Sequence, residues 1–74
     1  MARYRIELVT LDTERKAIRE DRGTYTRKDA AERGALKVAR DWAESHGMTH
    51  VQGDASFWAI ADASSVVHAN VFVK

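Results

Sequence analysis

The side chains best suited to chemistry in this chain are three histidines, at positions 46, 50 and 68. His46 and His50 are four residues apart, but Gly47 between them is typical of a helix end, so we do not expect them to share a helical face. No acidic residue stands at a metal-ligand spacing from His68, and the chain has no cysteine, which excludes thiolate-bound zinc. The sequence therefore predicts no metal site and no cofactor.

A second candidate is the cluster of Asp62, Ser64, Ser65 and His68, which has the residue types of a hydrolase. Neighbouring positions there alternate between faces or belong to a turn, so they do not converge on one point. A hydrolase also needs an enclosed pocket and an oxyanion hole, for which a two-layer domain of 74 residues has little room. The four glycines are scattered and form no phosphate-binding loop. We therefore expect a protein that is not an enzyme.

Length and charge indicate one small domain, residues 1–74. The net charge of +1 gives little long-range attraction to nucleic acid or to an anionic membrane. The first 37 residues carry a net charge of +3 and the remaining residues −2. The opening stretch "MARYRIELVTLD" mixes charged and apolar residues, unlike a secretory signal or a membrane span. We expect a cytoplasmic protein with no membrane partner.

The N-terminal part predicts strands. Apolar and charged residues alternate from Tyr4 onward, which is typical of a half-buried strand. Val9 and Leu11 break this alternation, which predicts a bulge or a change of face near Thr10. The charged stretch at residues 12–24 is either a hairpin with a return strand over 18–26 or a short solvated helix. The run of threonine and tyrosine before residue 27 favours the hairpin.

A helix is predicted after this stretch. Thr26 and Asp29 form a T-x-x-D start signal, and Gly47 stands where a left-handed residue would end the helix. Gly34 lowers the helix propensity slightly but narrows the apolar face, and Trp42 should supply most of its buried area. The predicted apolar stripe consists of Ala31, Ala35, Val38, Ala39 and Trp42.

The C-terminal part predicts a short strand and two hairpins, with turns at Gly53-Asp54 and Ser64-Ser65. One side of the last hairpin should carry Trp58, Ile60, Val67, Ala69, Val71 and Val73, with Trp58 buried under the helix. The other side should carry Phe57, Ala59, Ala61, His68, Asn70 and Phe72. The fold class is therefore α+β, with two layers: one α-helix packed on an antiparallel sheet of four to five strands.

One face of this sheet is expected to stay open, because a helix of about twenty residues, roughly 30 Å long, covers only one face. Two phenylalanines on an open sheet face are typical of an interaction surface. The predicted partner-binding residues are Phe57, His68, Asn70 and Phe72. The alternative is that the rings lie under the charged loop at residues 12–22.

A basic stripe lies on the predicted outer face of the helix. Its members are Arg33, Lys37 and Arg40. Such a stripe could contact nucleic acid or an acidic partner. Asp29 and Asp41 stand four residues from members of the stripe, so the stripe could equally be a solvated face of ion pairs.

The order of elements resembles a known group of proteins. The segments "RYRIELVTLD" and "TRKDAAERGALKVARDWAESHG", followed by a terminal hairpin, are similar in layout to small phage-encoded anti-CRISPR proteins. This resemblance implies a non-enzymatic inhibitor that occludes a site on a host protein complex, such as a CRISPR effector, in the host cytoplasm. No motif residue matches, so no site residue is carried over. The alternatives are a nucleic-acid-binding regulator that uses the basic helix face and a structural homo-oligomer such as a homodimer.

Overall fold

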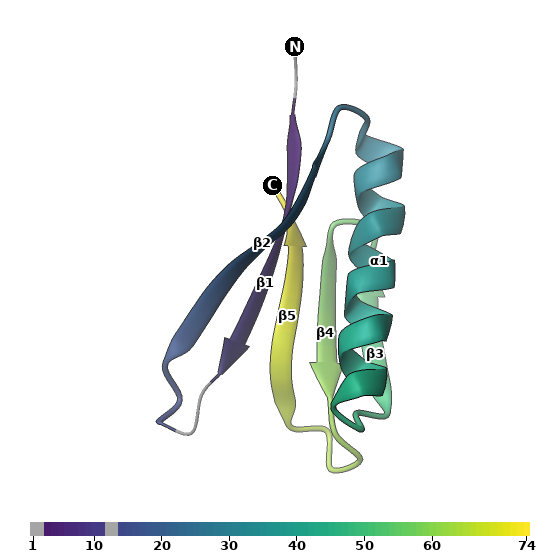
Figure 1. Cartoon of the computed structure of the whole chain (residues 1–74). Helices are drawn as coiled ribbons and strands as arrows, with labels where there is room; N and C mark the ends of the chain where they lie inside the picture. The colour runs from purple at the N-terminus through teal and green to yellow at the C-terminus, as the bar shows by residue number, and fades with distance from the viewer. Residues whose placement is uncertain (1–2, 12–13) are drawn as a thin grey trace.

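The computed structural model describes residues 3–11 and 14–74. Its elements follow the order β1 (Tyr4–Leu11), β2 (Ala17–Tyr25), α1 (Lys28–Ser45), β3 (His50–Asp54), β4 (Phe57–Ala61) and β5 (Val67–Val73). The strands form one antiparallel sheet with the order β2-β1-β5-β4-β3, and α1 lies on one of its faces (Figure 1). The predicted α+β fold with a helix on an antiparallel sheet is therefore confirmed, with five strands in the sheet.

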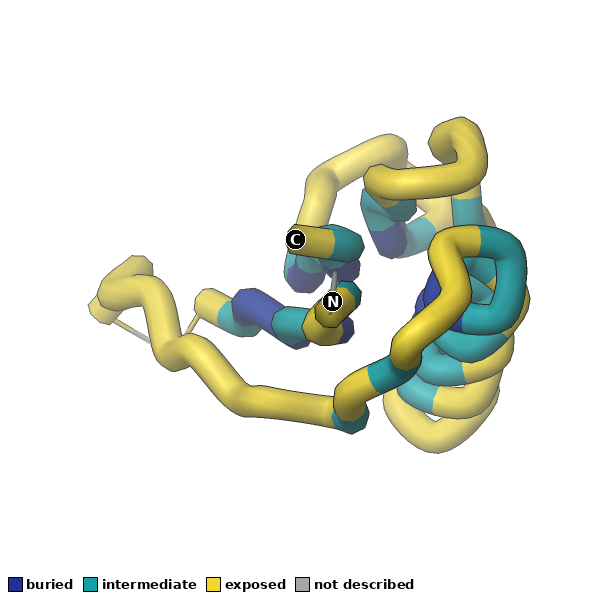
Figure 2. The backbone as a smooth tube through the Cα atoms, turned by 90° about the horizontal axis from the view of Figure 1, so that it is seen from above, coloured by how far each residue is buried: buried dark blue, intermediate teal, exposed yellow. Residues whose placement is uncertain are grey.

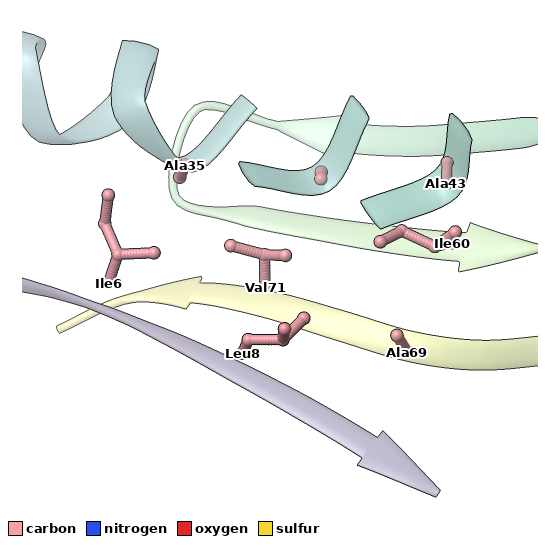
Figure 3. Packing of buried hydrophobic residues seen from close by; sticks show 8 residues of the cluster. Ile6, Leu8, Ala35, Ala43, Ile60, Ala69 and Val71 are labelled. Carbon is pink, nitrogen blue, oxygen red and sulfur yellow. The ribbon is translucent and has the colours of Figure 1, made fainter. Parts of the chain in front are cut away.

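The core forms where alanines of α1 meet large aliphatic residues of the three central strands. The fully buried large side chains are Ile6, Leu8, Ile60 and Val71. They face a row of buried alanines, at positions 31, 35, 39 and 43. Figure 3 shows Ala35 and Ala43 of this row above the aliphatic side chains of the sheet. Alanine recurs every four residues, and its small side chain lets the helix lie close on the sheet. Trp42 and Trp58 pack against this core but are only partly buried, so the prediction that both are buried is wrong.

The sequence signals predict the C-terminal end of α1 correctly but not its N-terminal cap. The N-cap residue is Arg27, with no side-chain cap hydrogen bond, so the predicted cap at Thr26 is wrong. Asp29, the predicted cap partner, instead accepts hydrogen bonds from the Arg27 guanidinium at 3.1 and 3.2 Å. At the other end Gly47 has φ of 68°, and the Met48 amide donates to the Ala43 carbonyl at 2.8 Å. This arrangement is the predicted glycine-terminated helix end.

The β1–β2 hairpin confirms the strand interpretation of residues 17–25 over the short helix. The predicted turn falls partly on residues 12–13, which lie outside the described residues. The predicted bulge or change of face near Thr10 is wrong, because β1 pairs without interruption there and the register shifts between Arg5 and Glu7 instead. The hairpin is exposed along most of β2 and runs away from α1 (Figures 1 and 2). Only the C-terminal end of β2, at Tyr25, therefore lies close to the helix.

The β3–β4 turn lies two residues later than predicted. Asp54 pairs with Phe57, so Ala55 and Ser56 form the turn, and the Ser56 amide donates to the Asp54 carboxylate at 3.3 Å. Gly53 belongs to β3, where a Cβ atom would collide with the backbone of Phe57. This glycine is therefore needed for the close approach of two strands, not for the turn itself.

The β4–β5 hairpin has the predicted pairing but not the predicted turn. Phe57 pairs with Phe72 and Ile60 with Ala69, as expected from alternation. The loop, however, spans residues 62–66, and a bulge follows it, because Ala61 pairs with Val67. The long loop and the bulge compensate each other, which restores the register of a two-residue turn.

Candidate binding surface

The face of the sheet opposite α1 is the candidate functional surface of this chain. Strand alternation from the buried residues of β1, β4 and β5 places apolar side chains there, in the middle of the sheet. We define the open face as Val9, Phe57, Ala59, Ala61, Val67, Asn70 and Phe72. Val9 and Ala61 are buried, with 9% and 8% of their surface exposed, although alternation places them on this face. Val9 therefore continues the alternation, and the face is apolar across several strands.

An aromatic pair lies at the end of the open face where β4 begins and β5 ends. The ring centroids of Phe57 and Phe72 are 5.1 Å apart, with their planes tilted by 46°. Phe57 is 39% exposed and Phe72 is half-buried, so the rings are accessible and not enclosed. Contact at this distance and tilt is favourable for aromatic rings, by about 0.5–1.5 kcal/mol beyond the burial of their area. The structure thus places a preformed apolar patch where the alternation predicted it.

Asn70 shares the open face with the aromatic pair. It is half-buried and lies between Ala59 of β4 and Val9 of β1. Of the four residues predicted to bind a partner, Phe57, Asn70 and Phe72 therefore lie together. Their role in binding stays a prediction.

The predicted placement of His68 on the open face is wrong. His68 has no opposite residue in β4, because the bulge leaves it between the pairs formed by its two neighbours. Its ring lines a hollow beside α1, together with Trp42, His46 and Met48. The same bulge places Val67 on the open face, where it pairs with Ala61 and is 41% exposed. One extra residue thus exchanges the two side chains between faces.

Asp62 organises the loop that precedes this bulge. Its carboxylate accepts hydrogen bonds from His68 Nε2 at 2.8 Å and from the amides of Ser64 and Val66 at 2.9 and 3.1 Å. The His68 hydrogen bond, followed by those of the loop amides, holds the pKa of the Asp62 carboxyl below its usual value. Through these hydrogen bonds, Asp62 and His68 stabilise the loop between β4 and β5. Within residues 3–11 and 14–74, no group of three or more metal-ligating side chains comes together.

Charged side chains flank the aromatic pair on both sides. Glu7 of β1 is the cross-strand neighbour of Phe72. Its carboxylate oxygen Oε1 forms ion pairs with Lys74 Nζ and Arg19 Nη1, each at 2.9 Å. The Lys74 hydrogen bond is the main cause that lowers the pKa of the Glu7 carboxyl, and Arg19 adds to it. We call Glu7, Arg19 and Lys74 the rim cluster; it carries a net charge of +1.

On the other side of the aromatic pair, Asp54 of β3 pairs with Phe57. A single row across the open face therefore runs from the positive rim cluster through two aromatic rings to a carboxylate. Sequence reasoning missed these charged residues because it did not establish which strands lie beside β5 and β4. The sequence signal that could have found them is the alternation in β1, once its pairing with β5 is known.

Two members of the basic helix stripe form ion pairs with acidic residues of α1. Arg33 pairs with Asp29 at 3.4 Å, and Lys37 pairs with Asp41 at 2.9 Å. The Asp41 hydrogen bond and charge raise the pKa of Lys37, which reflects this pairing. Arg40 is exposed on the same helix. The stripe is therefore a solvated surface of ion pairs, on the side of the molecule away from the open face.

Comparison with known proteins adds no assignment: no family model, curated protein or solved structure matches this chain. Among the described residues, no helix is both long and apolar enough to cross a membrane.

Proposed function

We propose that this chain is a non-enzymatic binding protein that docks its open face on a partner protein and thereby occludes a site there. The observation that carries this proposal is the Phe57–Phe72 pair, which stands accessible on the sheet face that α1 does not cover. Exposed apolar patches of this kind, rimmed by polar and charged groups, mark interaction sites in small soluble proteins.

The patch has the features of an interface centre. Aromatic anchors dominate binding energy when a partner desolvates them fully, and each contributes about 2 kcal/mol or more. Phe57 and Phe72 hold each other in place, so little side-chain entropy is lost on binding. Asn70 and the rim cluster add polar groups that can orient a partner.

Two observations favour a protein partner over nucleic acid. The rings of Phe57 and Phe72 are tilted against each other, whereas platforms for single strands present ring faces on which successive bases stack. In addition, Arg33 and Lys37 of the basic helix stripe already pair with Asp29 and Asp41, which lowers the net positive charge that this face offers to phosphates.

The layout shared with anti-CRISPR proteins suggests a first partner class to test, a CRISPR effector complex of the host. If the chain inhibits such a complex, inhibition depends on the open face. An interference assay with the wild-type chain and with open-face variants would measure that dependence.

The general test compares partner binding by the wild type and by the double variant Phe57→Ser/Phe72→Ser. A partner captured from a lysate of the source cells is identified by mass spectrometry, and its affinity is then measured by calorimetry. We expect the double variant to bind at least about tenfold more weakly, which corresponds to about 1.4 kcal/mol.

Two matched controls make this test specific. Ile18→Ser makes the same apolar-to-polar change at a residue that is 52% exposed on the splayed hairpin, away from the open face. The triple variant Arg33→Glu/Lys37→Glu/Arg40→Glu changes the charge of the helix back. Both controls should bind like the wild type. Equal binding by the Phe57/Phe72 double variant, in a folded state shown by its melting curve, would refute the proposed function.

A further inference from the structure

The row of side chains across the open face is complementary to itself. It runs from Glu7, with its two cations, through Phe72 and Phe57 to Asp54. Consider a second copy of the chain placed face to face, with a two-fold axis parallel to the strands and between β5 and β4. This operation lays Phe57 of each copy over Phe72 of the other, and Asp54 of each copy over Glu7 of the other.

The aromatic part of this arrangement matches known sheet packing. Two sheets pack face to face at about 10 Å, with side chains of the inner faces interdigitated. Phe57 and Phe72 would form a cluster of four rings across the axis. The residues next to them, Ala59 and Asn70, have short side chains that allow the sheets to approach.

The charges match as well. Lys74 and Arg19 both lie 2.9 Å from the same Glu7 oxygen, so the rim cluster presents a net positive charge at the position where Asp54 of the other copy would lie. Lys74 reaches over the open face, since its Nζ lies 6.0 Å from the centre of the Phe72 ring. Each copy thus offers one positive and one negative region, on opposite sides of the aromatic pair, and the axis brings unlike regions together twice.

The overlapping area predicts a weak dimer. Four strands about 4.8 Å apart, over about 17 Å of shared length, give a flat area of about 320 Å² per copy. The two copies together would bury about 640 Å², which is below the roughly 1,000 Å² of a stable interface and corresponds to a weak, transient association. A reversible association of this strength leaves the open face available to a competing partner.

We infer that a second copy of this chain occupies the open face when no other partner is bound, in a two-fold dimer held by the phenylalanine pair and by Asp54 against the rim cluster. This inference rests on the proposed function, because the same face binds the partner. Self-association then regulates access to that face, and partner binding separates the dimer.

The experiment measures mass by sedimentation equilibrium over concentrations from about 10 µM to about 1 mM, which spans the weak association expected. The wild type should change from monomer to dimer in this range. Asp54→Lys places a positive charge over the rim cluster, and Lys74→Glu makes that cluster negative, so each variant alone should self-associate at least about tenfold more weakly. An equimolar mixture of the two should recover dimers, because unlike charges face each other at both contacts again. Melting curves establish that each variant is folded.

Several results would overturn the inference. A wild type that stays monomeric at about 1 mM would do so, as would a dimer that survives Phe57→Ser/Phe72→Ser or a mixture that associates no better than its components. These outcomes are distinct from failure of the proposed function. A monomeric wild type whose partner binding still depends on the phenylalanines refutes the dimer alone. A dimer lost with Phe57→Ser/Phe72→Ser while partner affinity is unchanged refutes the proposed function, and with it the regulation of partner access, but leaves the dimer itself.

Discussion

Gly34 provides the sharpest test of the packing between β2 and α1. In the middle of a helix, alanine is more favourable than glycine by about 1 kcal/mol, so Gly34→Ala would stabilise an isolated helix. In the folded chain, however, a Cβ at position 34 would lie 2.6 Å from Tyr25 Oη, 2.9 Å from Tyr25 Cζ and 3.0 Å from Ile6 Cδ1. Ile6 is fully buried, so the tyrosine ring has no free space to shift toward it.

The magnitude follows from two opposing effects. Overpacking of a well-filled site costs about 1–3 kcal/mol, whereas the gain in helix propensity is about 1 kcal/mol. Gly34→Ala should therefore lower the free energy of unfolding of the wild type by up to about 2 kcal/mol. In a Tyr25→Ala background only the contact with Ile6 Cδ1 at 3.0 Å remains, and Ile6 can shift into the space that the ring leaves. The same substitution should then raise the free energy of unfolding by up to about 1 kcal/mol. The sign of the effect thus depends on Tyr25.

Urea denaturation of the four proteins in this double-mutant cycle measures the effect. We expect a coupling energy between positions 25 and 34 of about 1–3 kcal/mol, with similar m-values throughout. Tyr25→Phe is a useful third background, because it removes the closest contact but keeps the ring carbon at 2.9 Å. If Gly34→Ala stabilised the wild type and the Tyr25→Ala variant equally, the ring would not lie over Gly34, and the described packing would be refuted.

Three further predictions concern the core, the β4–β5 loop and the helix back. Ile60→Ala should cost about 2–5 kcal/mol in urea denaturation, because its side chain is fully buried against α1, and a cost below about 1 kcal/mol would contradict this core. Asp62 has a folded pKa below its unfolded value of 3.8, so its contribution to stability is present above that pH and is lost as the pH falls through the folded pKa. The difference in melting temperature between the wild type and Asp62→Asn should thus shrink as the pH falls below about 4; a difference that grows below about pH 4 would contradict this reasoning. Arg33→Glu/Lys37→Glu/Arg40→Glu should keep the circular dichroism spectrum of the wild type, and neither protein should bind a labelled oligonucleotide near about 50 mM salt in fluorescence anisotropy. Salt-dependent binding that this triple change abolishes would favour the nucleic-acid function instead.

Sequence periodicity alone was sufficient for the helix and for the main strand faces. The alanines that recur every four residues and the Gly47 helix end depend on interactions within a few residues, which a local pattern records. In the same way, strict alternation placed Phe57 and Phe72 on one face and Ile60 on the other, whatever the turn between the strands. The prediction of an apolar face opposite the helix follows from these local rules.

Tertiary structure decided the features that depend on contacts between distant segments. β1 lies between β2 and β5, and this pairing alone brings Glu7 beside Phe72 to form the rim cluster. The bulge that turns His68 toward α1 depends on how the loop at residues 62–66 folds around Asp62, and a shift of one residue reverses a side chain's face. Gly34 appears as a weakness of the helix in the sequence, yet it leaves the space that the ring of Tyr25 occupies. Local propensity does not contain this information, because the partner atoms come from other strands of the fold.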